Sequence, residues 1–74
     1  MLEIHIRDEY IKLGQAMKLA GLAEEGSDAK EAIASGQVAV NGEVETRRGR
    51  KLRVGDVFSF DGRDVQVCSQ NPLS

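Results

Sequence analysis

Five cationic side chains lie within seven consecutive positions of this sequence and form its densest cluster of one chemical type. They are Arg47, Arg48, Arg50, Lys51 and Arg53. Cations this close repel one another unless solvent or an anionic partner screens them, and a phosphate backbone is the commonest such partner. Four of the five are arginines, whose planar guanidinium groups bind phosphate through two hydrogen bonds. The pattern favours a phosphate-binding segment, and a merely solvated loop is the alternative.

The positive charge of this basic segment, residues 47–53, is local. The 74-residue chain has a net charge of −2. Residues 1–46 hold four basic and nine acidic side chains, and residues 54–74 hold one basic and three acidic side chains. We therefore expect an anionic partner to bind at the basic segment and not over the whole surface.

Length and composition limit what the chain can do. Its 74 residues predict a single domain over residues 1–70, with a flexible tail over residues 71–74. A small core leaves little room for an extended catalytic cavity. The sequence has no apolar run long enough for a membrane span and no signal-peptide pattern at its start, so we expect a cytoplasmic protein.

The residues that most often carry catalysis or bind metals are sparse. Cys68 is the only cysteine, which excludes an internal disulfide and a multi-cysteine zinc site, and we expect it to be a small core residue. His5 is the only histidine, and the alternation around it points it to solvent. We expect no pairing of His5 with Cys68, no metal, no cofactor and no enzymatic activity.

Two helices are predicted from apolar residues at helical spacing. The first covers residues 12–20, ends at Gly21, and has an apolar face of Leu13, Ala16, Met17 and Ala20. The second begins at Ser27, whose hydroxyl can cap free backbone amides, and ends at Gly36. Its narrow apolar stripe consists of Ala29, Ala32 and Ile33. On the first helix, Lys12 and Lys18 are too far apart in angle to form one tight cluster.

Strands and turns are predicted elsewhere. Leu2, Ile4 and Ile6 alternate with polar residues, as in a half-buried strand. A turn at residues 61–62 predicts a hairpin with Phe58, Phe60, Val65 and Val67 on one face. Residues 54–57 form a turn into this hairpin, and the alternation of Leu52, Arg53 and Val54 points Leu52 and Val54 inward.

The hairpin signal at Asn41-Gly42 raises a conflict. A two-residue turn would pair Ala39 with Val44 and place Glu45 on the apolar face of Val38. We therefore expect a bulge or a longer connection at this point.

The small aromatic content bears on the kind of nucleic acid. Tyr10, Phe58 and Phe60 are the only aromatic residues, none neighbours the basic segment in sequence, and we expect the phenylalanines to be buried. This argues against a base-stacking platform for single strands. Neither predicted helix has the side chains of a DNA recognition helix, so structured RNA is favoured and DNA is not expected.

Three strings of residues together resemble a known module: Leu13-Gly14-Gln15-Ala16-Met17-Lys18-Leu19-Ala20-Gly21-Leu22, then Ala29-Lys30 with Ile33, Gly36, Val38 and Val40-Asn41-Gly42, and then Val54-Gly55-Asp56-Val57. The pattern resembles the αL RNA-binding motif of small-subunit ribosomal protein number four, bacterial tyrosyl-tRNA synthetases and pseudouridine synthases. With residues 41–52 included, it looks like the small stand-alone bacterial members of the YbcJ and YaaA kind.

The resemblance implies an α+β fold, in which two short helices pack on a small, mostly antiparallel sheet of hairpins. It also implies a structured RNA as partner, with ribosomal RNA among the candidates. The family's basic residues at the two helices fall on Lys12 and Lys30. Two positions depart from the wider pattern. Gly14 replaces an acidic residue, and a Ser-Arg pair falls on Glu25-Gly26. The missing arginine shifts expected binding onto the basic segment.

The leading hypothesis is a non-catalytic protein that binds structured RNA, with a steep salt dependence. The expected phosphate contacts are Arg47, Arg48, Arg50, Lys51 and Arg53, flanked by Lys12, Lys18 and Lys30. The alternative is a protein-interaction module that docks its basic loop on an acidic, ribosome-associated partner.

Overall fold

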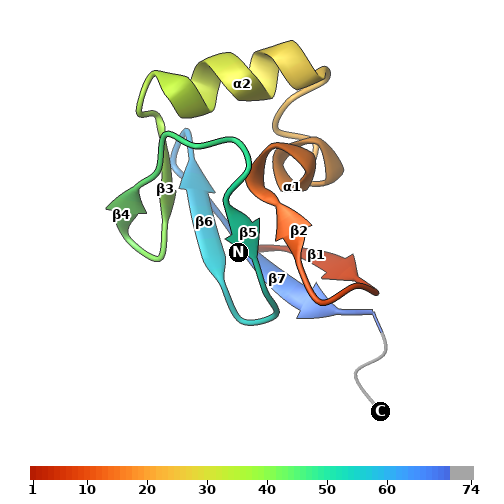
Figure 1. The fold of residues 1–74 in the computed structure, drawn as a ribbon. Coiled ribbons are helices and arrows are strands. Elements are labelled where there is room, and N and C mark those ends of the chain that lie inside the picture. Colours follow the sequence, from red (N-terminus) through yellow and green to blue (C-terminus); the bar gives the residue numbers. More distant parts are fainter. Residues whose placement is uncertain (71–74) are drawn as a thin grey trace.

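The computed structural model describes residues 1–70 and has the predicted α+β architecture (Figure 1). The predicted tail at residues 71–74 lies outside the described residues. In chain order the elements are β1 (Leu2–Ile6), β2 (Ile11–Lys12), α1 (Leu13–Leu19), α2 (Gly26–Ala34), β3 (Val38–Val40), β4 (Glu43–Val44), β5 (Lys51–Leu52), β6 (Val57–Phe60) and β7 (Arg63–Ser69). No helix among the described residues is long and apolar enough to cross a membrane.

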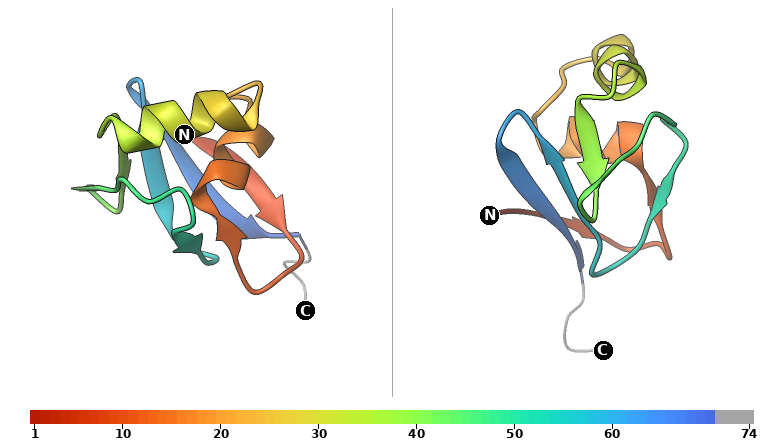
Figure 2. Two further views of the ribbon diagram at one scale, coloured as in Figure 1. Left: turned by 45° about the horizontal axis from the view of Figure 1, so that its top comes forward. Right: turned by 90° about the vertical axis from the view of Figure 1, so that its left-hand side faces the viewer.

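Within residues 1–70, the main sheet has five strands in the order β1-β7-β6-β3-β4. Its neighbours are antiparallel except for β1 and β7, the first and last strands, which run parallel. A separate two-stranded ribbon pairs β2 with β5. In the right-hand view of Figure 2, α2 lies above the main sheet and the β5 arrow stands apart on the opposite side from β7. The ribbon is important because it joins the basic segment to the start of α1.

The two helices end as the sequence predicts. Gly21 and Gly36 both have positive φ, at 76° and 80°. After each glycine the next amide reaches back to a carbonyl of the last turn, from Leu22 to Met17 at 2.9 Å and from Gln37 to Ala32 at 3.1 Å. These are the bonds of the Schellman motif, which glycine favours because it has no Cβ.

The start of the second helix differs from the prediction. The helix begins at Gly26 with Glu25 at the N-cap, and no side chain of the part of the chain that the structure describes makes a capping hydrogen bond there. Ser27 therefore lies inside the first turn. The polar residues before the helix did not distinguish between the two starting points, because several of them can occupy the cap.

The core lies between the helices and one face of the main sheet. The largest fully buried side chains are Phe58, Leu13, Met17, Ile33, Leu52, Val38, Val65 and Val67. The turn Asp61-Gly62 has positive φ at both residues, and Phe58 pairs with Val65 across the hairpin, as predicted. Burial of these apolar side chains, at about 25 cal/mol per Å², is the main stabilising contribution to the fold.

The hairpin between β3 and β4 contradicts the predicted bulge. Ala39 pairs with Val44 and Val40 with Glu43, so the turn has only two residues, Asn41 and Gly42. Both have positive φ, as this turn requires. The backbone amide of Glu45 donates to the Val38 carbonyl at 2.9 Å. Glu45 therefore does lie on the core side, with only 7% of its surface exposed.

Two further side-chain placements were predicted wrongly. Val54 is 55% exposed, whereas its neighbour Leu52 is fully buried as expected. The alternation ends because Val54 already belongs to the turn that leads into β6.

Cys68 is only partly buried, and it lies beside His5 in the β1–β7 pairing on the face opposite the core. The expected lack of pairing between these two residues is therefore also wrong, because the parallel register of the chain ends was not encoded locally.

Candidate functional site

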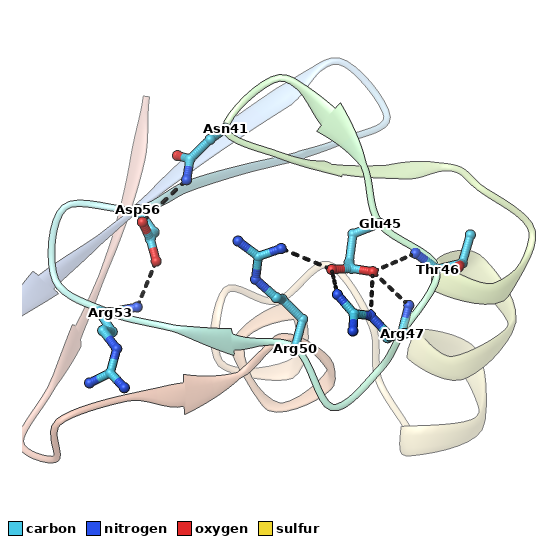
Figure 3. A network of polar contacts seen from close by, with 7 residues as sticks. All are labelled: Asn41, Glu45, Thr46, Arg47, Arg50, Arg53 and Asp56. Carbon is cyan, nitrogen blue, oxygen red and sulfur yellow. Dashed lines mark hydrogen bonds and ion pairs between the residues drawn. The ribbon is translucent and has the colours of Figure 1, made fainter.

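The loop between β4 and β5 is organised around the carboxylate of Glu45 (Figure 3). Its Oε2 accepts hydrogen bonds from the backbone amides of Thr46 at 3.0 Å and Arg47 at 3.1 Å, and from Arg47 Nε at 3.2 Å. Its Oε1 accepts from Arg47 Nη2 at 3.3 Å and from Arg50 Nη1 at 3.0 Å. The loop therefore folds back around one buried acid.

This arrangement lowers the pKa of Glu45 from 4.5 to about 2. The largest cause is hydrogen bonding by the Arg47 side chain, which outweighs the opposing effect of burial. The carboxylate is therefore charged at neutral pH and opposes the repulsion between Arg47 and Arg50. A guanidinium has five N–H donors, so both arginines keep donors for a further anion. The Arg47 side chain is 76% exposed and that of Arg50 is 40% exposed.

The same loop is bonded to the beginning of α1. The amide of Leu13 donates to the Arg50 carbonyl at 2.8 Å, and the amide of Gly14 donates to the Arg48 carbonyl at 3.1 Å. Both amides belong to the first turn of the helix, where no partner within the helix is available. The β2–β5 pairing extends this connection, with Lys12 opposite Lys51. The helix start and the basic segment thus support each other.

Gly14 allows the loop to lie this close to α1. A Cβ at position 14 would come within 2.7 Å of Arg48 Cγ and 3.2 Å of its Cδ. The aliphatic part of Arg48 therefore occupies the space that any other residue at position 14 would need. The packing of Arg48 explains why residue 14 of this chain is a glycine, where the αL pattern has an acidic residue.

A depression of about 350 Å³ opens beside Arg48. It is lined by Lys12, Gly14, Gln15, Lys18, Gly26, Arg48 and Gly49. Lys12 and Lys18, expected to be too far apart to cluster, therefore face one depression together with an arginine from the loop. Both glycines at which the chain departs from the αL pattern, Gly14 and Gly26, line it as well. We call these seven residues the basic depression.

Other cations of the basic segment face a second hollow. Arg47, Gly49, Arg50 and Lys51 line it, and its volume is about 450 Å³. The Lys51 ammonium also lies 4.8 Å from the centre of the Tyr10 ring. No aromatic residue neighbours the basic segment in the sequence, but Tyr10 lies beside it in the structure. The Tyr10 residue is 37% exposed. The β2–β5 ribbon brings Tyr10 there, and no local sequence signal indicated it.

Arg53 is positioned by its backbone. Its amide donates to Asp56 Oδ2 at 2.8 Å, and Asp56 Oδ1 accepts from Asn41 Nδ2 at 3.2 Å. Asn41 Oδ1 in turn accepts from the amide of Val57 at 3.0 Å. These bonds join the turn at residues 41–42 to the turn at residues 54–57, and both turns belong to the strings that resemble the αL motif. In Figure 3 the Arg53 guanidinium points away from the network.

The predicted site residues thus fall into groups. Lys12, Lys18 and Arg48 line the basic depression, and Arg47, Arg50 and Lys51 line the second hollow. Lys30, which is exposed on α2, lines neither. Sequence reasoning missed Glu45. The conflict at the Asn41-Gly42 hairpin was a signal for this residue, because a two-residue turn places Glu45, three positions after Gly42, on the core face.

Comparison with known proteins assigns the family. Residues 4–68 match the S4 domain family, which is nearly the whole chain. The chain belongs to the S4 domain family. The solution structure of YbcJ from Escherichia coli, described as showing an αL motif involved in RNA binding, superposes with a TM-score of 0.68 at 41% identity. The alignment covers 92% of this chain and 85% of that one.

Relatives by sequence agree with this assignment. "Putative RNA-binding protein YbcJ" of Escherichia coli is 48% identical over 60 residues, which is 81% of this chain and 86% of YbcJ. "Probable ribosome maturation protein RlbA" of Bacillus subtilis is 48% identical over 59 residues, which is 80% of this chain and 83% of RlbA. The S4 domain membership and the α+β fold inferred from the sequence are both confirmed.

Replacement of Glu45 by Gln should destabilise this S4 domain by about 2 kcal/mol at neutral pH, because hydrogen bonds to a charged group are lost. The folded-state pKa of Glu45 is lowered from 4.5 to about 2, so its stabilisation is complete above pH 4.5 and is lost as the pH falls towards 2. Urea unfolding at a series of pH values should show the two proteins converging over that range. The control is Glu43→Gln, at an exposed position on β4. A constant difference between Glu45→Gln and the native protein down to pH 2 would contradict this assignment.

Gly14→Ala tests the contact between the helix and the loop. Overpacking against Arg48 costs about 1–3 kcal/mol, which exceeds the gain of about 0.5–1 kcal/mol from alanine in a helix, so we expect a net loss near 1 kcal/mol. Amide resonances of residues 47–50 should shift in NMR spectra. The matched control is Gly26→Ala, because a Cβ there meets no atom of the described residues within 4 Å. Unchanged resonances of the loop in Gly14→Ala would show that Arg48 does not pack there.

Proposed function

We propose that this S4 domain is a non-catalytic protein that binds structured RNA through the basic depression and the adjoining basic segment. Arg48, Lys12 and Lys18 would contact one stretch of phosphates. Arg47, Arg50, Lys51 and Arg53 would contact the neighbouring stretch, and Lys30 on α2 would add a more distant positive charge.

The observation that carries this proposal is the position of Arg48. Its backbone carbonyl is bonded to the Gly14 amide, and its side chain lies against Gly14 where it lines the basic depression with both lysines. Cations held in place before binding lose less conformational entropy when a phosphate arrives. A mobile loop with the same charges would bind RNA more weakly.

The partner we propose is ribosomal RNA. Support comes from the Bacillus subtilis relative, whose name places it in ribosome maturation, and from the YbcJ structure, described as carrying a motif involved in RNA binding. Most predicted contacts are arginine or lysine groups suited to phosphate, which fits recognition of RNA shape more than of base sequence. A ribosomal partner would place the protein in the cytoplasm.

Charge reversal at Lys18 and Arg48 tests the proposed surface. Each reversal removes a charge-assisted hydrogen bond, so affinity for a ribosomal RNA fragment should fall at least about tenfold per site. For the native protein, log K should fall with log salt at a slope of about −2 to −4, and the slope should become shallower by about one for each phosphate that is no longer neutralised. Fluorescence anisotropy over a range of salt concentrations measures both quantities.

Arg63→Glu is the matched control for this experiment. It makes the same change of charge at an exposed position of β7, which lines neither hollow of the basic site. We expect it to change affinity only slightly, through long-range electrostatics. Equal losses in all variants, or a flat salt response of the native protein, would contradict phosphate binding at the basic depression.

Crosslinking in cells, followed by sequencing of the attached RNA, tests the identity of the partner. We expect crosslinks to concentrate in a few segments of ribosomal RNA and to disappear in the Lys18→Glu/Arg48→Glu variant. Recovery of RNA merely in proportion to its abundance would contradict a ribosomal partner. Retention of a ribosome-associated protein after nuclease treatment would instead favour the protein-docking alternative.

A further inference from the structure

Three side chains with metal-binding donors lie close together on the main sheet, outside the basic depression and the second hollow. They are Glu3 and His5 of β1 and Cys68 of β7. His5 and Cys68 are direct neighbours in the parallel pairing, and Glu3 lies two residues before His5 on the same strand. Ile4 and Ile6 alternate with them and are buried in the core. All three donors therefore lie on the face of the sheet that points away from the core.

The distances between these groups suit a single ion. One donor atom from each side chain can be chosen so that all three lie within 4.8 Å of one another. Donors around a tetrahedral zinc ion are about 3.5 Å apart, given metal–ligand distances of about 2.0–2.3 Å. Glu3 and His5 are exposed and Cys68 is partly buried, so small side-chain rotations can close the difference. The backbone needs no change, because the β1–β7 register already fixes it.

The surroundings also fit. Arg7, the residue that follows β1, donates from Nε to Gln70 Oε1 at 2.7 Å and is therefore engaged with the side-chain amide of the residue that follows β7. Burial raises the pKa of the Cys68 thiol, and the nearby Glu3 carboxylate raises it further. A raised thiol pKa disfavours the free thiolate, so a bound divalent cation must displace the thiol proton, as a coordinating metal does.

We propose that Glu3, His5 and Cys68 form a surface binding site for a divalent transition metal of the zinc class. A thiolate, an imidazole and a carboxylate form a donor set that favours zinc over magnesium or calcium, which prefer oxygen ligands alone. On binding, a metal–sulfur bond replaces the S–H bond of Cys68, and the proton passes to solvent. Water completes the fourth position.

The consequence for the protein is a metal link between β1 and β7, the first and last of its described strands. Among the described strands, β1 lies at the edge of the main sheet and pairs with β7 alone. A metal held by both strands would add a link across this edge and slow its local opening. This role is independent of RNA binding, because none of the three ligands lines the basic depression or the second hollow.

Cobalt titration of the reduced native protein tests the site, since Co²⁺ takes the place of zinc and reports its ligands. We expect visible bands of a tetrahedral cobalt centre and a near-ultraviolet sulfur-to-cobalt band at one equivalent, and both should disappear when Zn²⁺ is added. Cys68→Ser should abolish the sulfur band. His5→Gln and Glu3→Gln should each weaken binding about tenfold or more. The matched control Asp64→Asn, an exposed acid on the same strand as Cys68, should bind as the native protein does.

Hydrogen exchange provides a second measurement that does not rely on cobalt spectra. Zinc should slow amide exchange in β1 of the native protein and leave that of Cys68→Ser unchanged. The proposal is wrong if cobalt binds without a sulfur band, or if the three ligand variants bind as tightly as the native protein. Neither result would affect the proposed RNA site.

Discussion

The buried carboxylate of Glu45 is the interaction on which the geometry of the basic site depends. A charge removed from water is strongly unfavourable unless hydrogen bonds and opposite charges replace its hydration. The tight turn at Asn41-Gly42 leaves Glu45 no alternative, because the register of β3 and β4 places it on the core side. The side chains of Arg47 and Arg50 and two backbone amides donate hydrogen bonds to its carboxylate. The loop adopts the conformation that supplies them.

The second support of the loop is the first turn of α1. Helix starts have free amides that must be satisfied, and here the carbonyls of Arg48 and Arg50 satisfy those of Gly14 and Leu13. Glu45 fixes the side chains of the loop on one side while α1 fixes its backbone on the other. Arg48 lies between Arg47 and Arg50, the two arginines that Glu45 binds, and the aliphatic part of its side chain packs against Gly14. Arg48 is therefore held in place where it lines the basic depression.

The absence of side chains at two positions shapes the proposed binding surface. Gly14 gives room to Arg48, and Gly26 leaves open space at the start of α2. Where the wider αL pattern has an arginine before the second helix, this S4 domain has a loop arginine that reaches the same depression from another element. Positive charge near the helices is thus supplied by the basic segment. The acidic remainder of the chain would disfavour other orientations of a nucleic acid.

The sequence by itself determined that two helices form and end at glycines, the hairpin at Asp61-Gly62 and the S4 domain resemblance. These features follow from local periodicity and turn chemistry, which depend on residues a few positions apart. The burial of Glu45, the approach of Tyr10 to Lys51 and the pairing of His5 with Cys68 depend on strand register and on contacts between distant segments. Only the tertiary structure decided these. Tyr10 and Lys51, like His5 and Cys68, are far apart in the sequence, and the buried Glu45 carboxylate is favourable only because the loop folds Arg47 and Arg50 back onto it.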